Sequence, residues 1–202
     1  MNDLEMAQLI TDCTIELLKS KHFEKISIME ITKIVDISRV TFYNYFQNKE
    51  DVLDVLIENL LTNFDEIQKK NLPFLKNVDM EDSTAIKDIL FPNTLEIMIF
   101  FYENRKYISA LVSEHSPVDF MDILYATYYN HFLIALPEIF SVKFDKVIIA
   151  SYATYMTTGV KALTEEWFLS GFCQTSEEIT ERILTMLAPS LMELYTRKVG
   201  SP

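Results

Sequence analysis

The 202-residue sequence is poor in glycine and cysteine, and these shortages exclude several classes of protein. Glycine occurs only at Gly159, Gly171 and Gly200, so the chain has no glycine-rich loop of the kind that binds phosphate. Cys13 and Cys173 are isolated, and two cysteines are too few for a disulfide scaffold or a zinc finger. No Ser-His-Asp, Cys-His or paired-carboxylate set has a recognisable catalytic spacing. We therefore do not expect an enzyme.

Long apolar runs and targeting signals are also missing. The longest apolar run, residues 97–102, is far shorter than the roughly 18 residues that span a bilayer. The first residues, Met1–Glu5, lack the basic and apolar regions of a secretory signal peptide. The residues around His115 lack any recognised spacing of metal ligands. We expect a cytoplasmic protein with reduced thiols, no membrane association, no metal and no cofactor.

The residues that are present favour an all-α fold. Hydrophobic residues make up 49% of the chain, and apolar side chains recur at helical spacing along most of it. The net charge is −12, and residues 1–50 alone contain six basic and eight acidic side chains. Since non-specific binding to nucleic acid depends on positive charge, this balance predicts weak and salt-sensitive non-specific affinity for DNA.

The most informative stretch is Ser27–Lys49, which reads SIMEITKIVDISRVTFYNYFQNK. We interpret it as a helix, a tight turn and a second short helix, followed by the start of a third. Ser27 and Ser38 occupy positions typical of helix N-caps, and a glutamate follows Ser27 at the spacing of a capping box. Phe42 and Phe46 share the face of the second helix that we expect to be buried.

The other faces of the second short helix carry side chains that can contact DNA. Arg39, Thr41, Tyr43 and Tyr45 offer hydrogen-bond donors for base edges and phosphate oxygens. Lys49 lies in the first turn of the next helix, where a cation is unfavourable by roughly 0.3–1 kcal/mol. A DNA phosphate at that helix start would explain it. The alternative is that Lys49 is solvated surface and the tyrosines form the edge of the core. Residues 39–49 contain no acid, so the local field at this face suits DNA.

The run from Ser38 to Glu50, SRVTFYNYFQNKE, resembles the recognition-helix signature of the TetR family of transcription regulators. Residues 10–23 are similar to that family's first helix and the turn after it. The resemblance implies a helix-turn-helix in the major groove and a homodimer on a pseudo-palindromic, double-stranded DNA operator. The implied DNA contacts are Thr41, Tyr43 and Lys49 at phosphates, Arg39, Val40 and Tyr45 at bases or the adjoining backbone, and the two cap residues Ser27 and Ser38.

Two positions depart from the family's pattern. The family usually has glycine where this chain has His22, and often has glycine where this chain has Asp36. We expect both residues to adopt a left-handed backbone, which histidine and aspartate reach more easily than most other residues.

The resemblance divides the chain into a helix-turn-helix DNA-binding domain at residues 1–47 and a helical ligand-binding and dimerisation domain at residues 48–202. Residues 48–70 carry a long apolar stripe and predict a helix long enough to connect the two domains. In the family, ligand binding tilts the DNA-reading heads through this helix. A linker is expected at 71–83, followed by helices at about 87–105, 105–113, 117–137, 145–169 and 176–198, with Pro92 and Pro189 as starts, kinks or breaks.

The last two of these helices have broad apolar faces and a short connection. Thr175 and Glu178 have the spacing of a capping box at the start of the second one. The pair can form half of a four-helix bundle, with the other half supplied by a second copy in an isologous dimer. Gly159 can then permit close approach of the two copies. The alternative is that both faces are filled by the same chain.

The middle of the chain is rich in aromatic residues, which admits two interpretations. A plain core between helices explains most of them. A cavity is the functional interpretation, because a buried tyrosine hydroxyl needs a partner and bundle interiors commonly bind small molecules. Such a cavity would take an apolar or aromatic ligand with a few polar groups. The candidate ligand-binding residues are Phe101, Tyr102, Tyr107, His115, Tyr125, Tyr128, Tyr129, Phe132, Tyr155 and Trp167.

Residues 101–105 and 158–172 loosely resemble the branch of the TetR family that includes dihydroxyacetone-kinase-linked activators. Our leading interpretation is a dimeric transcription regulator, most often a repressor in this family, whose DNA affinity is controlled by a small ligand. The alternative is a TetR-shaped module that is regulated by or acts through a partner protein and binds DNA weakly or not at all. The acidic first domain favours that alternative.

Overall fold

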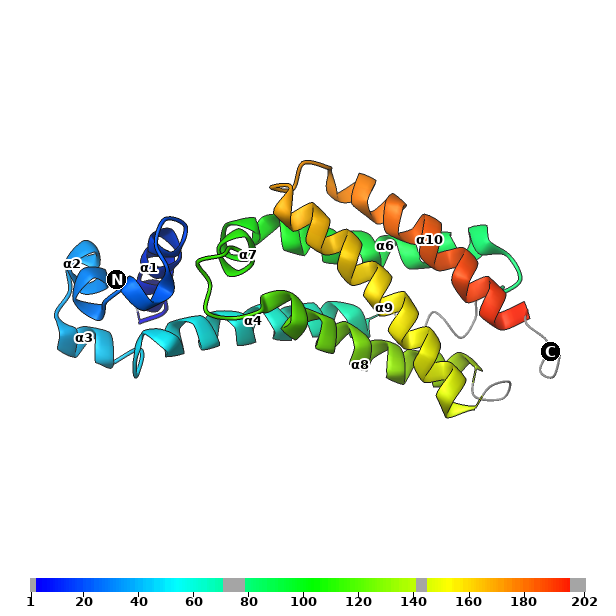
Figure 1. Cartoon of the computed structure of the whole chain (residues 1–202), viewed down its shortest axis with the longest axis horizontal. Coiled ribbons are helices and arrows are strands. Elements are labelled where there is room, and N and C mark those ends of the chain that lie inside the picture. The colour runs from blue at the N-terminus through cyan, green and yellow to red at the C-terminus, as the bar shows by residue number, and fades with distance from the viewer. Residues whose placement is uncertain (1–2, 71–78, 141–144, 197–202) are drawn as a thin grey trace. The chain divides into compact units, whose positions relative to one another are not determined.

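The structure is a computed structural model that describes residues 3–70, 79–140 and 145–196. The regular structure of these residues consists of helices with no strand, which confirms the predicted all-α fold (Figure 1). None of the described helices combines the length and the apolar character needed to cross a bilayer. The chain forms two compact units, one of Met1–Asn63 with Lys106–Phe120 and one of Phe64–Arg105 with Met121–Pro202.

The first unit contains the predicted helix-turn-helix. Its core is made of apolar side chains from helices that the sequence separates widely. Its elements are α1 (Asp3–Leu18), the 3-10 helix η1 (Phe23–Lys25), α2 (Ile28–Val35), α3 (Arg39–Tyr43), the start of α4 (Lys49–Lys69) and α7 (Arg105–Leu111). The buried side chains include Ile10, Ile15, Leu18, Phe23, Ile31, Phe42, Phe46, Val52, Leu53, Ile108 and Leu111.

Local signals explain where α2 and α3 begin and where α2 ends. The Ser27 hydroxyl accepts a hydrogen bond from the backbone N–H of Glu30 at 3.2 Å, and the Ser38 hydroxyl accepts one from the N–H of Thr41 at 2.9 Å. Asp36 ends α2 with φ 59° and ψ 51°, so the predicted left-handed conformation is confirmed there. The turn between the two helices is therefore fixed by caps at both sides.

The expectation of a left-handed backbone at His22 was wrong. His22 has φ −52° and ψ 138°, a region open to all L-residues, and it precedes η1. The backbone N–H of Phe23 donates to the carbonyl of His115 at 3.1 Å. The turn is thus held by a distant segment of the same unit and needs no residue with positive φ.

The division into compact units falls within helix α4, and the boundary between residues 47 and 48 stays a prediction. Helix α4 continues without a break from Lys49 to Lys69, and the first unit keeps it as far as Asn63. Residues 106–120, which follow the helix α6 (Ser83–Glu103) in sequence, also belong to the first unit. Helix α4 is therefore shared by the two units. Most of the predicted linker, residues 71–78, lies outside the described residues.

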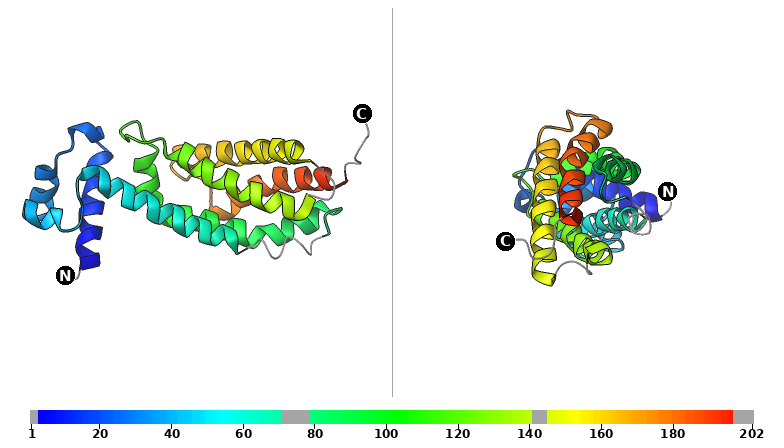
Figure 2. Two further views of the ribbon diagram at one scale, coloured as in Figure 1. Left: turned by 90° about the horizontal axis from the view of Figure 1, so that it is seen from below. Right: turned by 90° about the vertical axis from the view of Figure 1, so that its right-hand side faces the viewer.

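The second unit is a helical bundle. It contains the last turns of α4 together with α6, α8 (Phe120–Phe140), α9 (Lys146–Leu169) and α10 (Ser176–Thr196). Helices α6, α8, α9 and α10 run along one another, and α10 packs against both α6 and α9 (Figures 1 and 2). The capping box at the start of α10 is formed in both directions, with Thr175 N–H donating to Glu178 at 2.8 Å and Glu178 N–H donating to Thr175 at 3.2 Å.

Three prolines lie inside helices of this unit. Pro92 lies within α6, Pro137 within α8 and Pro189 within α10. Pro92 therefore does not start a helix, Pro189 does not end one, and α8 continues past Pro137 to Phe140. A proline in a helix interior costs about 3 kcal/mol, so packing in the bundle outweighs the local signal.

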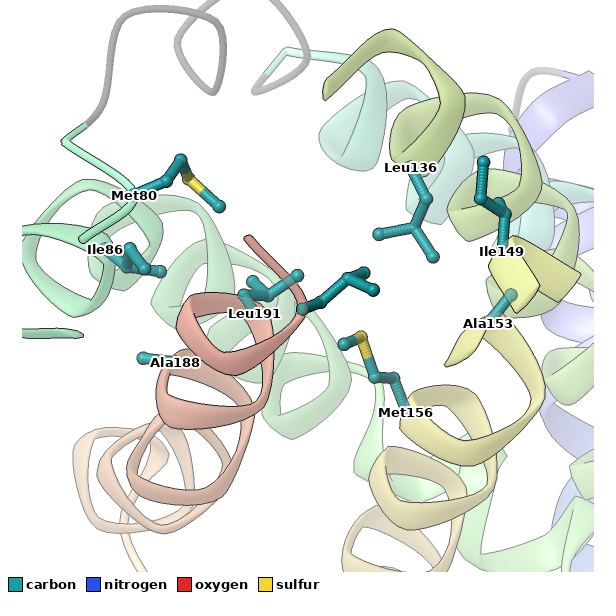
Figure 3. Close-up of a cluster of buried hydrophobic side chains, with 9 residues drawn as sticks. Met80, Ile86, Leu136, Ile149, Ala153, Met156, Ala188 and Leu191 are labelled. Atoms are coloured by element: carbon teal, nitrogen blue, oxygen red, sulfur yellow. The ribbon is translucent and has the colours of Figure 1, made fainter. Parts of the chain in front are cut away.

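One buried cluster joins four of the bundle's segments (Figure 3). Met80 and Ile86 come from the start of the α6 segment, and Leu136 comes from α8. Their side chains point toward those of α9 and α10 in Figure 3. Burial of these apolar surfaces, at about 25 cal/mol per Å², holds the bundle together. The cluster is completed by Ile149, Ala153, Met156, Ala188, Leu191 and Leu194.

Candidate functional site

Helix α3 presents one buried side and one exposed side. Phe42 is fully buried and lies 6.0 Å from Phe46 between ring centroids, which anchors the helix to the core. On the other side, Val40 is 73% exposed, and Arg39 and Tyr43 are also exposed. A guanidinium, a branched apolar group and a phenol therefore project together from a five-residue helix. These groups suit guanine, the thymine methyl group and a phosphate oxygen respectively.

Hydrogen bonds order the polar groups along this side. The Ser38 and Thr41 hydroxyl oxygens lie 2.8 Å apart. The Arg39 guanidinium donates to the Tyr43 hydroxyl at 3.4 Å, a long bond that is easily exchanged for a stronger acceptor. The Tyr45 hydroxyl donates to the carboxylate of Asp3 at 3.1 Å. Tyr45 therefore has a partner within its own unit, and its hydrogen bond to Asp3 must break before its hydroxyl can contact DNA.

Lys49 differs from the other predicted DNA contacts. Its ammonium donates to the backbone carbonyls of Phe23 at 2.8 Å and Ile26 at 3.0 Å, and it lies 4.4 Å from the centroid of the Phe23 ring. Two of its three protons are thus used inside the unit. The favourable contacts with two carbonyls explain a cation at a helix start without a DNA phosphate. The sequence could not reveal this, because η1 is 23 to 26 residues away.

The start of α4 and the start of α2 are also locally satisfied. Asn48 accepts a hydrogen bond from the N–H of Asp51 at 2.7 Å, and Asp51 accepts one from the N–H of Gln47 at 2.8 Å. The Glu30 carboxylate pairs with Lys21 at 2.7 Å. That hydrogen bond holds the pKa of Glu30 below its usual value. The acid nearest the start of α2 is therefore balanced by a cation of its own unit.

Tyr107 and His115, two predicted ligand residues, belong to the first unit. The Tyr107 hydroxyl donates to Asp12 at 2.8 Å and accepts from Gln8 at 2.7 Å. Burial and the hydrogen bond with Asp12 raise the pKa of Tyr107 to about 12. The His115 ring lies edge-on to the His22 ring with 4.7 Å between centroids. Both residues tie the 106–120 segment to α1 and the following turn, and neither lines the cavity described below.

The second unit contains a cavity of about 90 Å³. Its wall is built from the last turn of α4, α6, α8, α9 and α10, and most of the lining side chains are apolar. Of the ten predicted ligand residues, Tyr128 and Phe132 line it. Gln68 and Asn93, which no sequence pattern marks as ligand residues, line it too. A glutamine near the end of an apolar helix gives no sequence signal that separates a cavity residue from a surface one.

The remaining predicted ligand residues have other surroundings. Phe101 and Trp167 are buried in the aromatic core of the second unit, where the indole N–H of Trp167 donates to the carbonyl of Gln174 at 3.0 Å. Tyr125 and Tyr129 stack on each other with ring centroids 6.0 Å apart. The last two, Tyr102 and Tyr155, are exposed.

Two polar groups in the cavity wall are deeply buried. The side chain of Gln68 is 3% exposed and that of Tyr128 is 4% exposed. Within the described part of the chain, the Gln68 carbonyl oxygen Oε1 and the Tyr128 hydroxyl have no hydrogen-bond partner. Burial raises the pKa of Tyr128. Burial also lowers the pKa of His131, the third polar ring of the wall.

A shallow apolar groove lies on the outer side of α9 and α10. Tyr155 is 66% exposed there, and Met186 is also exposed. Gly159 lies in the groove, and a side chain added to it would meet no atom of this chain within 4 Å. Exposed apolar residues next to a bare glycine suit close packing against another helix. The groove is lined by Tyr155, Met156, Gly159, Val160, Ala162, Leu163, Ile183, Met186, Leu187 and Ser190.

Comparison with known proteins identifies the family of the chain. Residues 10–56 match the family described as bacterial regulatory proteins, tetR family. Residues 88–189, just over half of the chain, match the one described as transcriptional regulator C-terminal region.

Two curated relatives match parts of the chain. The HTH-type dhaKLM operon transcriptional activator DhaS of Lactococcus lactis is 43% identical over 44 residues, which are 22% of this chain and 24% of DhaS. The uncharacterized HTH-type transcriptional regulator YvdT of Bacillus subtilis is 32% identical over 127 residues, or 60% of each protein. The matches therefore span less than two thirds of either relative.

Solved structures share the fold over nearly the whole chain. The dihydroxyacetone kinase operon activator DhaS has a TM-score of 0.60 at 20% identity, covering 94% of this chain and 97% of that one. A TetR-family transcriptional regulator from Syntrophomonas wolfei has a TM-score of 0.63 at 21% identity, covering 95% and 96%. The chain belongs to the TetR family of DNA-binding transcriptional regulators, and it is a regulator rather than an enzyme.

Proposed function

We propose that this protein is a dimeric repressor that binds a pseudo-palindromic operator through α3 and is released by a small ligand in the second unit. The observation that carries the proposal is the exposed side of α3, where Arg39, Val40 and Tyr43 project from a helix anchored by Phe42. No acid lies between Arg39 and Lys49 in the sequence. Helix α3 itself therefore carries one cation and no acid, although the chain as a whole carries −12.

In this proposal the residues of α3 have different tasks. Arg39 and Val40 read base edges in the major groove, because they are exposed near the N-terminal end of the recognition helix. Ser38, Thr41 and Tyr43 contact phosphates and set the register. Ser27, at the start of α2, contacts a further phosphate of the DNA backbone. Tyr45 contributes only after it leaves Asp3, and Lys49 acts by holding η1 against the start of α4.

The groove on α9 and α10 supports the dimer. A homodimer of this family needs one self-complementary face, and the groove combines exposed apolar side chains with the bare backbone at Gly159. Two copies packed through it place two α3 helices on one operator, which accounts for a pseudo-palindrome.

The cavity and α4 support ligand control. Gln68 in the last turn of α4 lines the cavity, and Lys49 in the first turn of the same helix holds η1. A ligand that binds one position of α4 more tightly than another shifts the population of head spacings that fit the operator. Because DNA is its target, we place the protein in the cytoplasm.

Repression needs no contact beyond occupation of the promoter, and we therefore propose it as the output. The relative DhaS is named as an operon transcriptional activator. A reporter gene placed behind the recovered operator must therefore decide between repression and activation. Expression that rises when the regulator gene is deleted supports repression. Expression that falls on deletion replaces it with activation.

The proposal is tested by selecting bound fragments from sheared genomic DNA of the source organism at moderate salt. The wild-type chain is compared with an Arg39→Ala, Tyr43→Ala double variant and with Thr185→Ala, which changes an exposed residue of α10. We expect a few sites with an inverted repeat for the wild type and for Thr185→Ala, and none for the double variant. Enrichment that survives the double variant would show that α3 is not the reading element.

A partner-protein module is the second candidate function. The net negative charge of residues 1–50 favours it, because an acidic unit repels DNA phosphates. The same selection decides between the two: folded, dimeric wild-type protein that enriches no sequence supports the partner-protein module and overturns the repressor proposal.

A further inference from the structure

Two buried side chains that line the same small cavity each carry a polar atom without a hydrogen-bond partner among the described residues. The carbonyl oxygen Oε1 of Gln68 and the hydroxyl of Tyr128 have no hydrogen bond within the described residues, and both side chains line the 90 Å³ cavity. Nearly all buried polar groups in folded proteins are paired, so a group that is not paired requires an explanation. Two such groups in one cavity wall indicate a partner that enters from outside the chain.

The neighbouring asparagine and threonine side chains donate to helix carbonyls and not to these two atoms. Asn93 donates to the carbonyl of Ile67 at 2.6 Å, and Thr94 donates to the carbonyl of Leu90 at 2.9 Å. The Thr164 hydroxyl donates to the carbonyl of Val160 at 2.8 Å. Each of these bonds satisfies a helix backbone. Oε1 of Gln68 therefore needs a donor, and the Tyr128 hydroxyl needs an acceptor or a donor.

The charge of the cavity wall restricts the partner further. Among the described residues, no lysine, arginine, aspartate or glutamate lines the cavity. Burial lowers the pKa of His131, and although Asp65 raises it in part, the net shift favours the uncharged ring at neutral pH. An ion in this cavity would lose its hydration without gaining a counter-charge, which is strongly unfavourable. The partner is therefore uncharged.

We propose that the ligand of this cavity is a small uncharged alcohol whose hydroxyl donates to Gln68 Oε1 and accepts from the Tyr128 hydroxyl. The proposal rests on the ligand control proposed above and names the chemical class of that ligand. One hydroxyl supplies both a donor and an acceptor, whereas an ether or ketone cannot satisfy Gln68. The apolar remainder of the wall takes the alkyl part. An apolar cavity of about 150 Å³ binds benzene, so 90 Å³ suits a short alkyl chain.

The position of Gln68 gives the ligand a direct effect on α4. Gln68 lies in the last turn of this helix, and Tyr128 lies on α8. The Tyr128 ring is packed edge-on against Phe64 of α4, with 4.7 Å between centroids. A hydroxyl bound to both residues joins α4 to α8 through hydrogen bonds that the chain alone does not form.

The test uses saturation-transfer NMR on the full chain without DNA. The probes are 1-butanol, its isomer methyl propyl ether, butyrate and butylammonium, which share the alkyl part but differ in donor and charge. We expect transfer to 1-butanol only. Gln68→Leu and Tyr128→Phe should each weaken 1-butanol binding about fivefold, the factor for one lost hydrogen bond. Tyr125→Phe, which alters a tyrosine outside the cavity wall, should bind like the wild type.

Several results would overturn the ligand class. Equal transfer to the ether would show that the hydroxyl is not read, and preferential transfer to butyrate or butylammonium would show a charged site. Undiminished binding by Tyr128→Phe, or a lower melting temperature of that variant without probe, would assign the hydroxyl a structural role. The measurement is independent of DNA. An operator recovered from genomic DNA without 1-butanol binding refutes the ligand class alone, and 1-butanol binding without an operator refutes the repressor alone.

Discussion

The ammonium group of Lys49 donates a hydrogen bond of 2.8 Å to the backbone carbonyl of Phe23. A second bond of 3.0 Å reaches the carbonyl of Ile26, so one side chain closes both ends of the turn that contains η1. We predict that Lys49→Met lowers the free energy of unfolding by about 1.5–3 kcal/mol, the range for hydrogen bonds to charged groups. Thermal and urea unfolding of the full chain measure it, with Lys33→Met, at an exposed lysine of α2, as the control.

The same variant distinguishes two roles for Lys49. If Lys49 acts mainly at a DNA phosphate, Lys49→Met leaves the melting temperature unchanged and reduces the slope of operator affinity against salt by about one. If Lys49 instead holds η1 in place, Lys49→Met lowers the melting temperature of the free protein. An unchanged melting temperature would therefore restore the phosphate contact that the sequence predicts.

Arg39 provides a test of base reading. Its guanidinium is exposed and makes only a long bond of 3.4 Å to Tyr43. We predict that Arg39→Ala relaxes the base preference at one position of each half-site at a cost of about 1–3 kcal/mol, because a bidentate contact with guanine is lost. Selection from a randomised operator library measures the preference at every position. A variant that loses affinity for all sequences equally would assign Arg39 to a phosphate instead.

Val40 gives a prediction of a different kind. Its side chain is 73% exposed although it is apolar, and it lies one residue after Arg39 near the start of α3. We predict that it contacts a thymine methyl group, so Val40→Ser should weaken binding to the wild-type operator but not to one with uracil at that thymine. Fluorescence anisotropy with both duplexes measures the difference. The same loss on both duplexes would remove Val40 from the set of base readers.

The local signals of the sequence predicted much of the fold. The helix predicted at residues 48–70 is observed at Lys49–Lys69, and the one predicted at 145–169 is observed at Lys146–Leu169. These limits depend on residues that act on their own neighbours, such as the Thr175 and Glu178 capping box. The prolines suggested helix ends that are not observed. The free energy that a proline costs inside a helix is outweighed here by the packing of that helix in the bundle.

The contacts of individual side chains were much less predictable. Lys49 bonds to a carbonyl 26 residues away, and Tyr107 bonds to Asp12 across 95 residues. Such partners depend on tertiary packing, which no local pattern records. The abundance of tyrosine pointed to a cavity, but which tyrosine lines it, and that Gln68 lines it too, depended on the packing of α4 and α8.

Gly159 provides a test of the dimer. A glycine in a helix interior is unfavourable by roughly 0.5–1 kcal/mol relative to alanine, and a side chain there meets no atom of the same chain within 4 Å. We predict that Gly159→Glu leaves the helix content unchanged but weakens the dimer at least about tenfold, because a charge is buried at the contact. Sedimentation equilibrium measures it, with Thr154→Glu, on α9 outside the groove, as the control. Equal dimerisation of both variants would move the interface to another face.

The network of Tyr107, Asp12 and Lys106 predicts how stability depends on pH. Burial opposes ionisation of Asp12, but hydrogen bonds from Tyr107 and Lys106 bring its pKa below the ordinary value. A carboxylate with a lowered pKa in the folded state stabilises fully above the unfolded pKa of about 3.9. That contribution is lost as the pH falls through the folded pKa. We therefore predict that Asp12→Asn lowers stability by about 1 kcal/mol at pH 7, and that the difference from wild type shrinks as the pH falls through the lowered pKa of Asp12.

At alkaline pH the same network loses its contribution to stability as the pH rises. The pKa of Tyr107 is raised to about 12, so its contribution is complete below the unfolded value of about 10 and is lost between pH 10 and 12. Tyr107→Phe should therefore differ from wild type at pH 7 and lose that difference toward pH 12. Urea unfolding of wild type, Asp12→Asn and Tyr107→Phe across the pH range measures both windows. If Tyr107→Phe is as stable as wild type at pH 7, the segment 106–120 is held to α1 by apolar contacts, and the network only orients it.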